Sequence, residues 1–117
     1  MILQPENSSL CGQCCLATIL GTTLEHAILL IGHSHGTYPK ELAKHFKCDT
    51  VVLTRGIPSK YSLCKVHFET KKQTHWVLFK DFKVYDPCAG QWLPVEVWEE
   101  CFAHVIPRIT SYIEIKE

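Results

Sequence analysis

Residues 4–20, QPENSSLCGQCCLATIL, run from a polar, turn-rich segment directly into an apolar segment. The apolar residues after Cys11 recur at helical spacing, which predicts a helix, and Gly21 predicts its end. Ser8 or Ser9 can cap this helix, so Cys11 falls in its first turn. Unpaired N–H groups and the positive end of the helix dipole favour a thiolate at that position.

Gln4 lies just upstream and brings an amide donor to the same end of the predicted helix. A thiolate beside fixed N–H donors is what acyl transfer requires, because the donors stabilise the charge that develops on the attacked carbonyl. The segment therefore indicates acyl-transfer chemistry at Cys11, with a capped structural cysteine as the alternative. We expect Cys14 and Cys15, one turn further on, to be core residues.

The cysteines and histidines allow two other interpretations, a redox motif and a zinc site. Cys11 and Cys14 have the spacing of a thioredoxin-like Cys-x-x-Cys motif, but that fold needs a strand ahead of the motif, and only ten mostly polar residues precede Cys11. His33 and His35 lack the paired Cys and His spacing of a zinc site, so we expect a polar loop there and no metal.

The composition is that of an ordinary globular domain. The chain has 117 residues, 46% hydrophobic and 21% charged, with a formal net charge of +0. We expect a single domain over residues 1–117, and the charge balance indicates neither nucleic acid nor an acidic membrane surface as a partner. No apolar run approaches the ~20 residues of a membrane span. The N-terminus does not resemble a signal peptide, and the seven cysteines are odd in number, so we expect reduced thiols and a cytoplasmic location.

The remaining pattern predicts helices first and an antiparallel sheet afterwards, which is the α+β class. Thr22 or Thr23 can cap the second predicted helix and Thr37 the third, with Pro39 in the first turn of the third. Besides the helix that begins near Cys11, the predicted helices are residues 24–31, 37–46 and 94–103. The predicted strands are residues 50–54, 63–69, 74–80, 83–86 and 108–115. The predicted loops include residues 71–73 and 87–93.

The predicted hairpin of residues 74–86 brings a histidine close to a carboxylate. If Lys80 and Asp81 form a two-residue turn, His75 lies directly opposite Asp86. If Asp81 and Phe82 form the turn, His75 and Asp86 are diagonal neighbours on one face, whereas a three-residue turn separates them. A histidine beside an aspartate is an oriented base, because the carboxylate fixes its tautomer. We expect His75 to be mostly exposed in a cleft.

Taken together, these motifs resemble a papain-like cysteine peptidase, most closely the bacteriocin-processing (double-glycine) peptidases. The resemblance rests on the block CGQCCLA at residues 11–17 and on HWVL at 75–78 followed by VYDPCAG at 84–90, in that order. It implies a papain-like fold with the N-terminal helices packed on the sheet. It further implies Cys11 as nucleophile, His75 as general base, Asp86 as its orienting residue and Gln4 as oxyanion donor.

The function predicted on this basis is hydrolysis of a peptide or protein substrate through an acyl-enzyme, without a cofactor. Two alternatives stay open. A catalytically silent papain-like domain would bind a peptide without cleaving it, and a transacylase or isopeptidase would use the same acyl-enzyme with a different acceptor or bond. Retention of Cys11, His75, Asp86 and Gln4 together favours the enzyme, because a domain that only binds has no need of all four.

Overall fold

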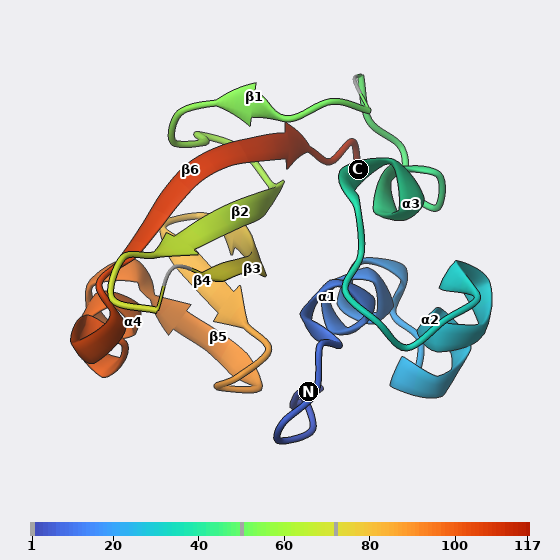
Figure 1. The fold of residues 1–117 in the computed structure, drawn as a ribbon. Coiled ribbons are helices and arrows are strands. Elements are labelled where there is room, and N and C mark those ends of the chain that lie inside the picture. Colours follow the sequence, from blue (N-terminus) through green and yellow to red (C-terminus); the bar gives the residue numbers. More distant parts are fainter. Residues whose placement is uncertain (1, 50, 72) are drawn as a thin grey trace.

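The α+β class is confirmed by the computed structural model of the chain, which describes residues 2–49, 51–71 and 73–117. An antiparallel six-stranded sheet has the strand order β1-β6-β2-β3-β4-β5. Figure 1 shows α1–α3 on one side of this sheet and α4 on the other. The elements are α1 (Cys11–Leu20), α2 (Leu24–Ile31), α3 (Pro39–Ala43), β1 (Thr54–Arg55), β2 (Ser62–Phe68), β3 (Gln73–Lys80), β4 (Lys83–Asp86), β5 (Gln91–Pro94), α4 (Val95–Cys101), the 3-10 turn η1 (Ala103–Val105) and β6 (Pro107–Glu114).

Helix α1 begins at Cys11 and ends at Gly21, which adopts the left-handed conformation expected of a C-terminal glycine. The predicted serine cap is wrong. Leu10 occupies the N-cap position without a side-chain hydrogen bond, and the Ser8 hydroxyl donates to the Pro5 carbonyl instead. No serine side chain therefore accepts a hydrogen bond from the first-turn N–H groups of α1, the turn that contains Cys11.

The next two helices follow their predictions to different extents. Helix α2 has the predicted bounds and is capped by Thr23, whose hydroxyl accepts the His26 N–H. Helix α3 is shorter than predicted, and its N-cap is Tyr38 rather than Thr37. Glu41 explains the shift, because its carboxylate accepts the Tyr38 backbone N–H and closes the first turn from within the helix.

One strand prediction and one loop prediction fail at the edges of the sheet. The predicted strand 50–54 is wrong: the chain bends at Val51 and Val52, and β1 covers only Thr54–Arg55 (Thr50 lies outside the described residues, as does Lys72 of the predicted loop 71–73). The predicted loop 87–93 is partly wrong, because β5 starts within it and pairs with β4. Helix α4 accordingly begins at Val95, after Pro94 has ended β5.

The sheet separates two apolar clusters, one on each face. Alternation along β3 assigns Trp76 and Leu78 to the cluster that packs on α1, and Val77 and Phe79 to the cluster that packs on Trp98 of α4. Strands β2, β3 and β4 therefore form the middle layer, with both faces covered.

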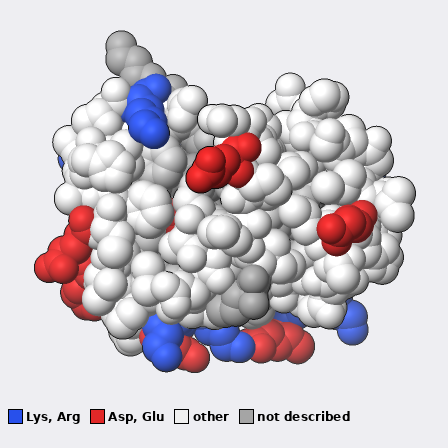
Figure 2. All heavy atoms as spheres, turned by 90° about the horizontal axis from the view of Figure 1, so that it is seen from below, with Lys and Arg blue, Asp and Glu red and all other residues white. Residues whose placement is uncertain are grey.

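The exposed surface is mixed in charge. Figure 2 shows the molecule from below, the side on which the N-terminal segment and β5 lie in Figure 1, and most of the atoms on this face are uncharged.

In the described part of the chain, no single helix is long and apolar enough to cross a membrane. The two helices α1 and α2 meet that test only as a pair, with a bend of 109° between them.

Candidate active site

The turn between β3 and β4 fixes which residues of the hairpin meet. Lys80 pairs with Lys83, so Asp81 and Phe82 form a two-residue turn. Both have positive φ, 52° and 61°, as a type I′ turn requires. The second of the two predicted registers is therefore the correct one, and it makes His75 and Asp86 diagonal neighbours.

His75 and Asp86 form a buried ion pair. The His75 Nε2–H donates to Asp86 Oδ1 over 2.7 Å, and the side chains are 7% and 0% exposed. The expectation of a mostly exposed histidine is wrong, because His75 lies opposite Val66 of β2 and its ring stacks on Phe68 at a centroid distance of 5.3 Å. Burial at this level strengthens the electrostatic coupling between the two side chains.

The Asp86 carboxylate is also held by two N–H groups outside the hairpin pair. Trp98 Nε1 of α4 donates to Oδ2 over 3.0 Å, and the Cys88 backbone N–H donates to Oδ1 over 2.9 Å. Burial raises the pKa of Asp86, but His75 and these two donors more than offset that effect and keep the pKa below its ordinary value. The carboxylate is therefore ionised and fixed in orientation.

His75 is correspondingly held as an imidazolium. Burial lowers its pKa, but the hydrogen bond to Asp86, the contacts with Cys11 and Cys88 and the Asp86 charge together raise the pKa well above its ordinary value. The charged pair satisfies the rule that buried ions are retained only when they are paired and hydrogen-bonded.

Cys11 lies at the first position of α1 and is half-buried. Burial alone raises the pKa of its thiol, but the hydrogen bond and charge of His75 and the backbone N–H groups of Trp76 and Gly12 bring the pKa below its ordinary value. Cys11 thus has the His75 imidazolium beside it and N–H donors around its sulfur. These are the features of an activated nucleophile.

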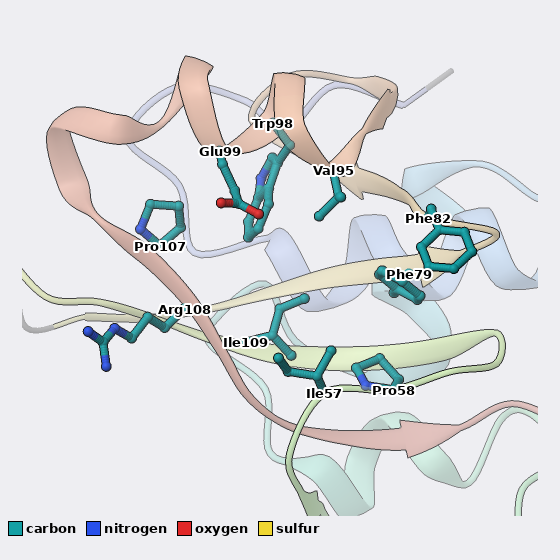
Figure 3. Close-up of a pocket in the computed structure, with 10 residues that line it drawn as sticks. All are labelled: Ile57, Pro58, Phe79, Phe82, Val95, Trp98, Glu99, Pro107, Arg108 and Ile109. Atoms are coloured by element: carbon teal, nitrogen blue, oxygen red, sulfur yellow. The ribbon is translucent and has the colours of Figure 1, made fainter.

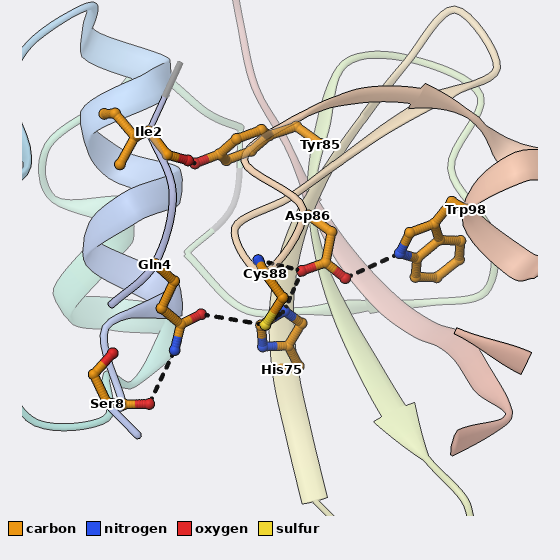
Figure 4. Close-up of polar contacts among 8 residues, drawn as sticks. All are labelled: Ile2, Gln4, Ser8, His75, Tyr85, Asp86, Cys88 and Trp98. Atoms are coloured by element: carbon orange, nitrogen blue, oxygen red, sulfur yellow. Dashed lines mark hydrogen bonds and ion pairs between the residues drawn. The ribbon is translucent and has the colours of Figure 1, made fainter. Parts of the chain in front are cut away.

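Gln4 reaches the same region, but its amide is already engaged. Its Nε2 donates to the Ser8 carbonyl over 2.9 Å, and its Oε1 accepts from the Cys88 thiol over 3.7 Å (Figure 4). Its backbone N–H donates to the Pro87 carbonyl, which ties the N-terminal segment to the end of β4. One of the two amide hydrogens is therefore bonded to the Ser8 carbonyl.

The sequence did not predict that Cys88 and Trp98 contact His75 and Asp86. Cys88 is exposed, and its Sγ lies 3.9 Å from His75 Nε2. The hairpin register contains the signal for Cys88, because continuing the pairing of Leu78 with Tyr85 would put position 88 opposite position 75. No comparable signal exists for Trp98, whose contact with Asp86 depends on how α4 packs on the sheet.

The other residues near Cys11 have structural roles. Cys14 is fully buried and its pKa is raised to about 12 by burial and by the neighbouring thiols, which makes it a poor partner for thiol exchange with Cys11. Gln13 donates from its side chain to the carbonyls of His33 and His35, at 3.1 and 2.9 Å, and so fixes the loop before α3 against α1.

A separate cavity of about 570 Å³ lies on the α4 side of the sheet (Figure 3). Its lining is mainly apolar and includes Phe79, Val95 and Ile109, but none of Cys11, His75, Asp86 and Gln4. Trp98 connects the two regions, since its ring lines this cavity while its indole N–H holds Asp86.

Comparisons of this chain with protein-family models, with curated proteins and with solved structures found no match. The resemblance to papain-like peptidases therefore rests on the sequence motifs alone.

Proposed function

We propose that this chain is a cysteine peptidase of papain-like type that acts on a peptide or protein. The observation that carries the proposal is the arrangement of Cys11, His75 and Asp86: a thiol with a lowered pKa at a helix N-terminus, next to a histidine whose Nε2 is bonded at 2.7 Å to a buried carboxylate. Because Asp86 takes Nε2, the other ring nitrogen, Nδ1, is the one that exchanges a proton with substrate and thiol.

The proposed reaction proceeds in two steps. The Cys11 thiolate attacks the scissile carbonyl carbon, and His75 gives its proton to the leaving amine as the C–N bond breaks and a thioester forms. Water then attacks the thioester, His75 takes the proton from that water, and the acid product leaves with Cys11 restored. The Cys11 backbone N–H and the second amide hydrogen of Gln4 stabilise the oxyanion in both steps.

Selective alkylation tests the activated thiol without requiring a substrate. At pH 6, brief treatment with iodoacetamide should modify Cys11 ahead of Cys88 and Cys101, although both of these are exposed, because only a thiolate reacts quickly. Peptide mass mapping reads out the order. Equal labelling of the three cysteines, or faster labelling of Cys88, would contradict the assignment of Cys11 as nucleophile.

Cleavage itself is tested with a mixed peptide library analysed by mass spectrometry. Wild type and the control Cys101→Ala should produce the same fragments, and Cys11→Ala should produce none. The bound Gln4 amide is the one observation that favours a binding domain without catalysis. If Cys11→Ala and wild type bind the same peptides and neither cleaves any, the chain is a peptide-binding domain and not a peptidase.

A further inference from the structure

Three side chains of metal-binding type converge beside the proposed nucleophile without including it. His75 Nε2, Asp86 Oδ1 and Cys88 Sγ all lie within 4.8 Å of one another. They come from β3, the end of β4 and the turn that follows, so the hairpin register brings them together. Figure 4 shows the Cys88 sulfur between the Gln4 amide and the His75 ring.

We propose that His75, Asp86 and Cys88 form a binding site for one zinc ion. Zinc in proteins is bound by thiolate, imidazole and carboxylate ligands, whereas magnesium and calcium are bound by oxygen ligands. The site goes beyond the proposed peptidase, because binding depends on these three side chains and not on turnover.

The spacing of the ligand atoms suits a tetrahedral ion after a small adjustment. Zinc bonds of about 2.0–2.3 Å put neighbouring ligand atoms roughly 3.3–3.6 Å apart. The Cys88 Sγ to His75 Nε2 distance is 3.9 Å, slightly longer than this, and Cys88 is exposed on a turn, so its side chain can move inward. The His75 Nε2 to Asp86 Oδ1 distance of 2.7 Å is shorter, because a proton now lies between these atoms.

The metal therefore replaces protons. Zinc displaces the proton on His75 Nε2 and the proton on the Cys88 thiol, and both leave to solvent. The Asp86 carboxylate and the Cys88 thiolate then balance the two charges of the ion, and the fourth position is open to water. Asp86 keeps its orienting donor, Trp98 Nε1, as an outer partner of the kind that holds metal ligands in place.

Zinc on His75 Nε2 would also affect the proposed reaction. A metal on Nε2 removes the hydrogen bond that orients His75 and leaves Asp86 bound to the ion. Reversible zinc binding would then switch the peptidase off, a consequence that, unlike the site itself, rests on the proposed function.

Cobalt(II) is the probe for the test, because a cobalt–thiolate bond gives a charge-transfer band in the near ultraviolet. The reduced full chain should develop this band and saturate at one equivalent, and zinc should displace the cobalt. Cys88→Ser should lose the band and bind zinc more than about tenfold more weakly, since even outer partners of a metal have effects of that size. Cys101→Ser, which removes the other exposed thiol, should keep both, and circular dichroism should show each variant to be folded.

Three results would overturn the proposal: no band, binding that does not saturate at one equivalent, or an unchanged band in Cys88→Ser. Cys11→Ser should keep the band, and its loss there with retention in Cys88→Ser would place the metal on the nucleophile instead. The cobalt experiment and the peptidase proposal can fail separately. A chain that binds cobalt through Cys88 but cleaves no peptide would support the metal site and contradict the proposed function.

Discussion

His75 and Asp86 meet diagonally across the hairpin rather than directly, and their 2.7 Å bond depends on the turn between their strands, where Asp81 and Phe82 have positive φ. Diagonal neighbours in an antiparallel pair are further apart than direct partners, so only side chains that extend toward each other make such a contact. The pair is therefore a property of the turn between β3 and β4 as much as of the two residues.

Asp86→Asn tests the orienting role. The substitution keeps the shape of the side chain but removes the charge, so the His75 pKa should fall because its main stabilising partner is lost. Turnover should fall at least tenfold; the corresponding change in a serine protease costs ~10⁴. Nuclear magnetic resonance titration of the His75 ring measures the first effect. Asp81→Asn, at the turn of the same hairpin, is the control and should change neither quantity.

Trp98→Phe tests the support of the buried carboxylate. Loss of the indole donor should destabilise the fold by about 1–3 kcal/mol near neutral pH, because a buried charged acceptor loses a partner. The stability that comes from ionised Asp86 is present above the ordinary pKa of 3.8 and is lost as the pH falls through the lower folded pKa, so the difference between variant and wild type should shrink in acid. Urea unfolding at several pH values measures it.

The control for Trp98→Phe is Trp92→Phe, whose ring packs against Tyr61 and Tyr85 rather than a carboxylate. Its destabilisation should not change between neutral and acid pH. A difference for Trp98→Phe that is equally independent of pH would show that the indole contributes packing alone.

Phe82→Gly tests the strain in the turn. Phe82 has φ of 61° and is 78% exposed, so glycine should relieve an unfavourable backbone conformation at little cost in packing. The expected gain is about 0.5–1 kcal/mol in the free energy of unfolding, since Asp-Gly is a preferred type I′ sequence. Phe82→Ala removes the same ring but keeps the strain, so an equal gain in both variants would contradict this explanation.

Gly12→Ala tests the close packing beside Cys11. A Cβ at position 12 would lie 2.0 Å from Thr37 Oγ1, so the loop before α3 must move, which should cost about 1–3 kcal/mol. Thr37→Ala should restore most of the loss in the double variant. Among the described residues Thr37 Oγ1 has no hydrogen-bond partner, so Thr37→Ala alone should cost little. Unfolding in urea measures all three, and additive effects would mean that the two side chains do not collide.

The sequence predicted the parts of the fold that depend on local pattern. Helix α2 has the predicted bounds and β4 the predicted residues, because caps, periodicity and turn length act over a few residues. The same locality explains the failures. Val51 and Val52 suit a strand but lie in a bend, whereas β5, which contains Pro94, becomes a strand because β4 pairs with it.

The proximity of His75 and Asp86 could be predicted from the sequence, but the environment of the candidate site could not. The register of the hairpin allows only a few relative positions for His75 and Asp86, so their proximity was predictable. The burial of His75, the Trp98 hydrogen bond and the Ser8 contact of Gln4 depend on tertiary packing of segments distant in sequence. No local pattern encodes these contacts.

The strand order has a consequence for when the site forms during folding. Strand β6 is the last element along the chain, yet it lies inside the sheet, between β1 and β2. At the other end of the chain, Tyr85 Oη donates to the Ile2 carbonyl, and the Gln4 N–H to that of Pro87. Such distant pairings form late, because the chain must close long loops before it gains their contacts. A ribosome would release Cys11 into solution well before His75 and the completed sheet, so the Cys11 thiol meets His75 only once nearly the whole domain has been synthesised.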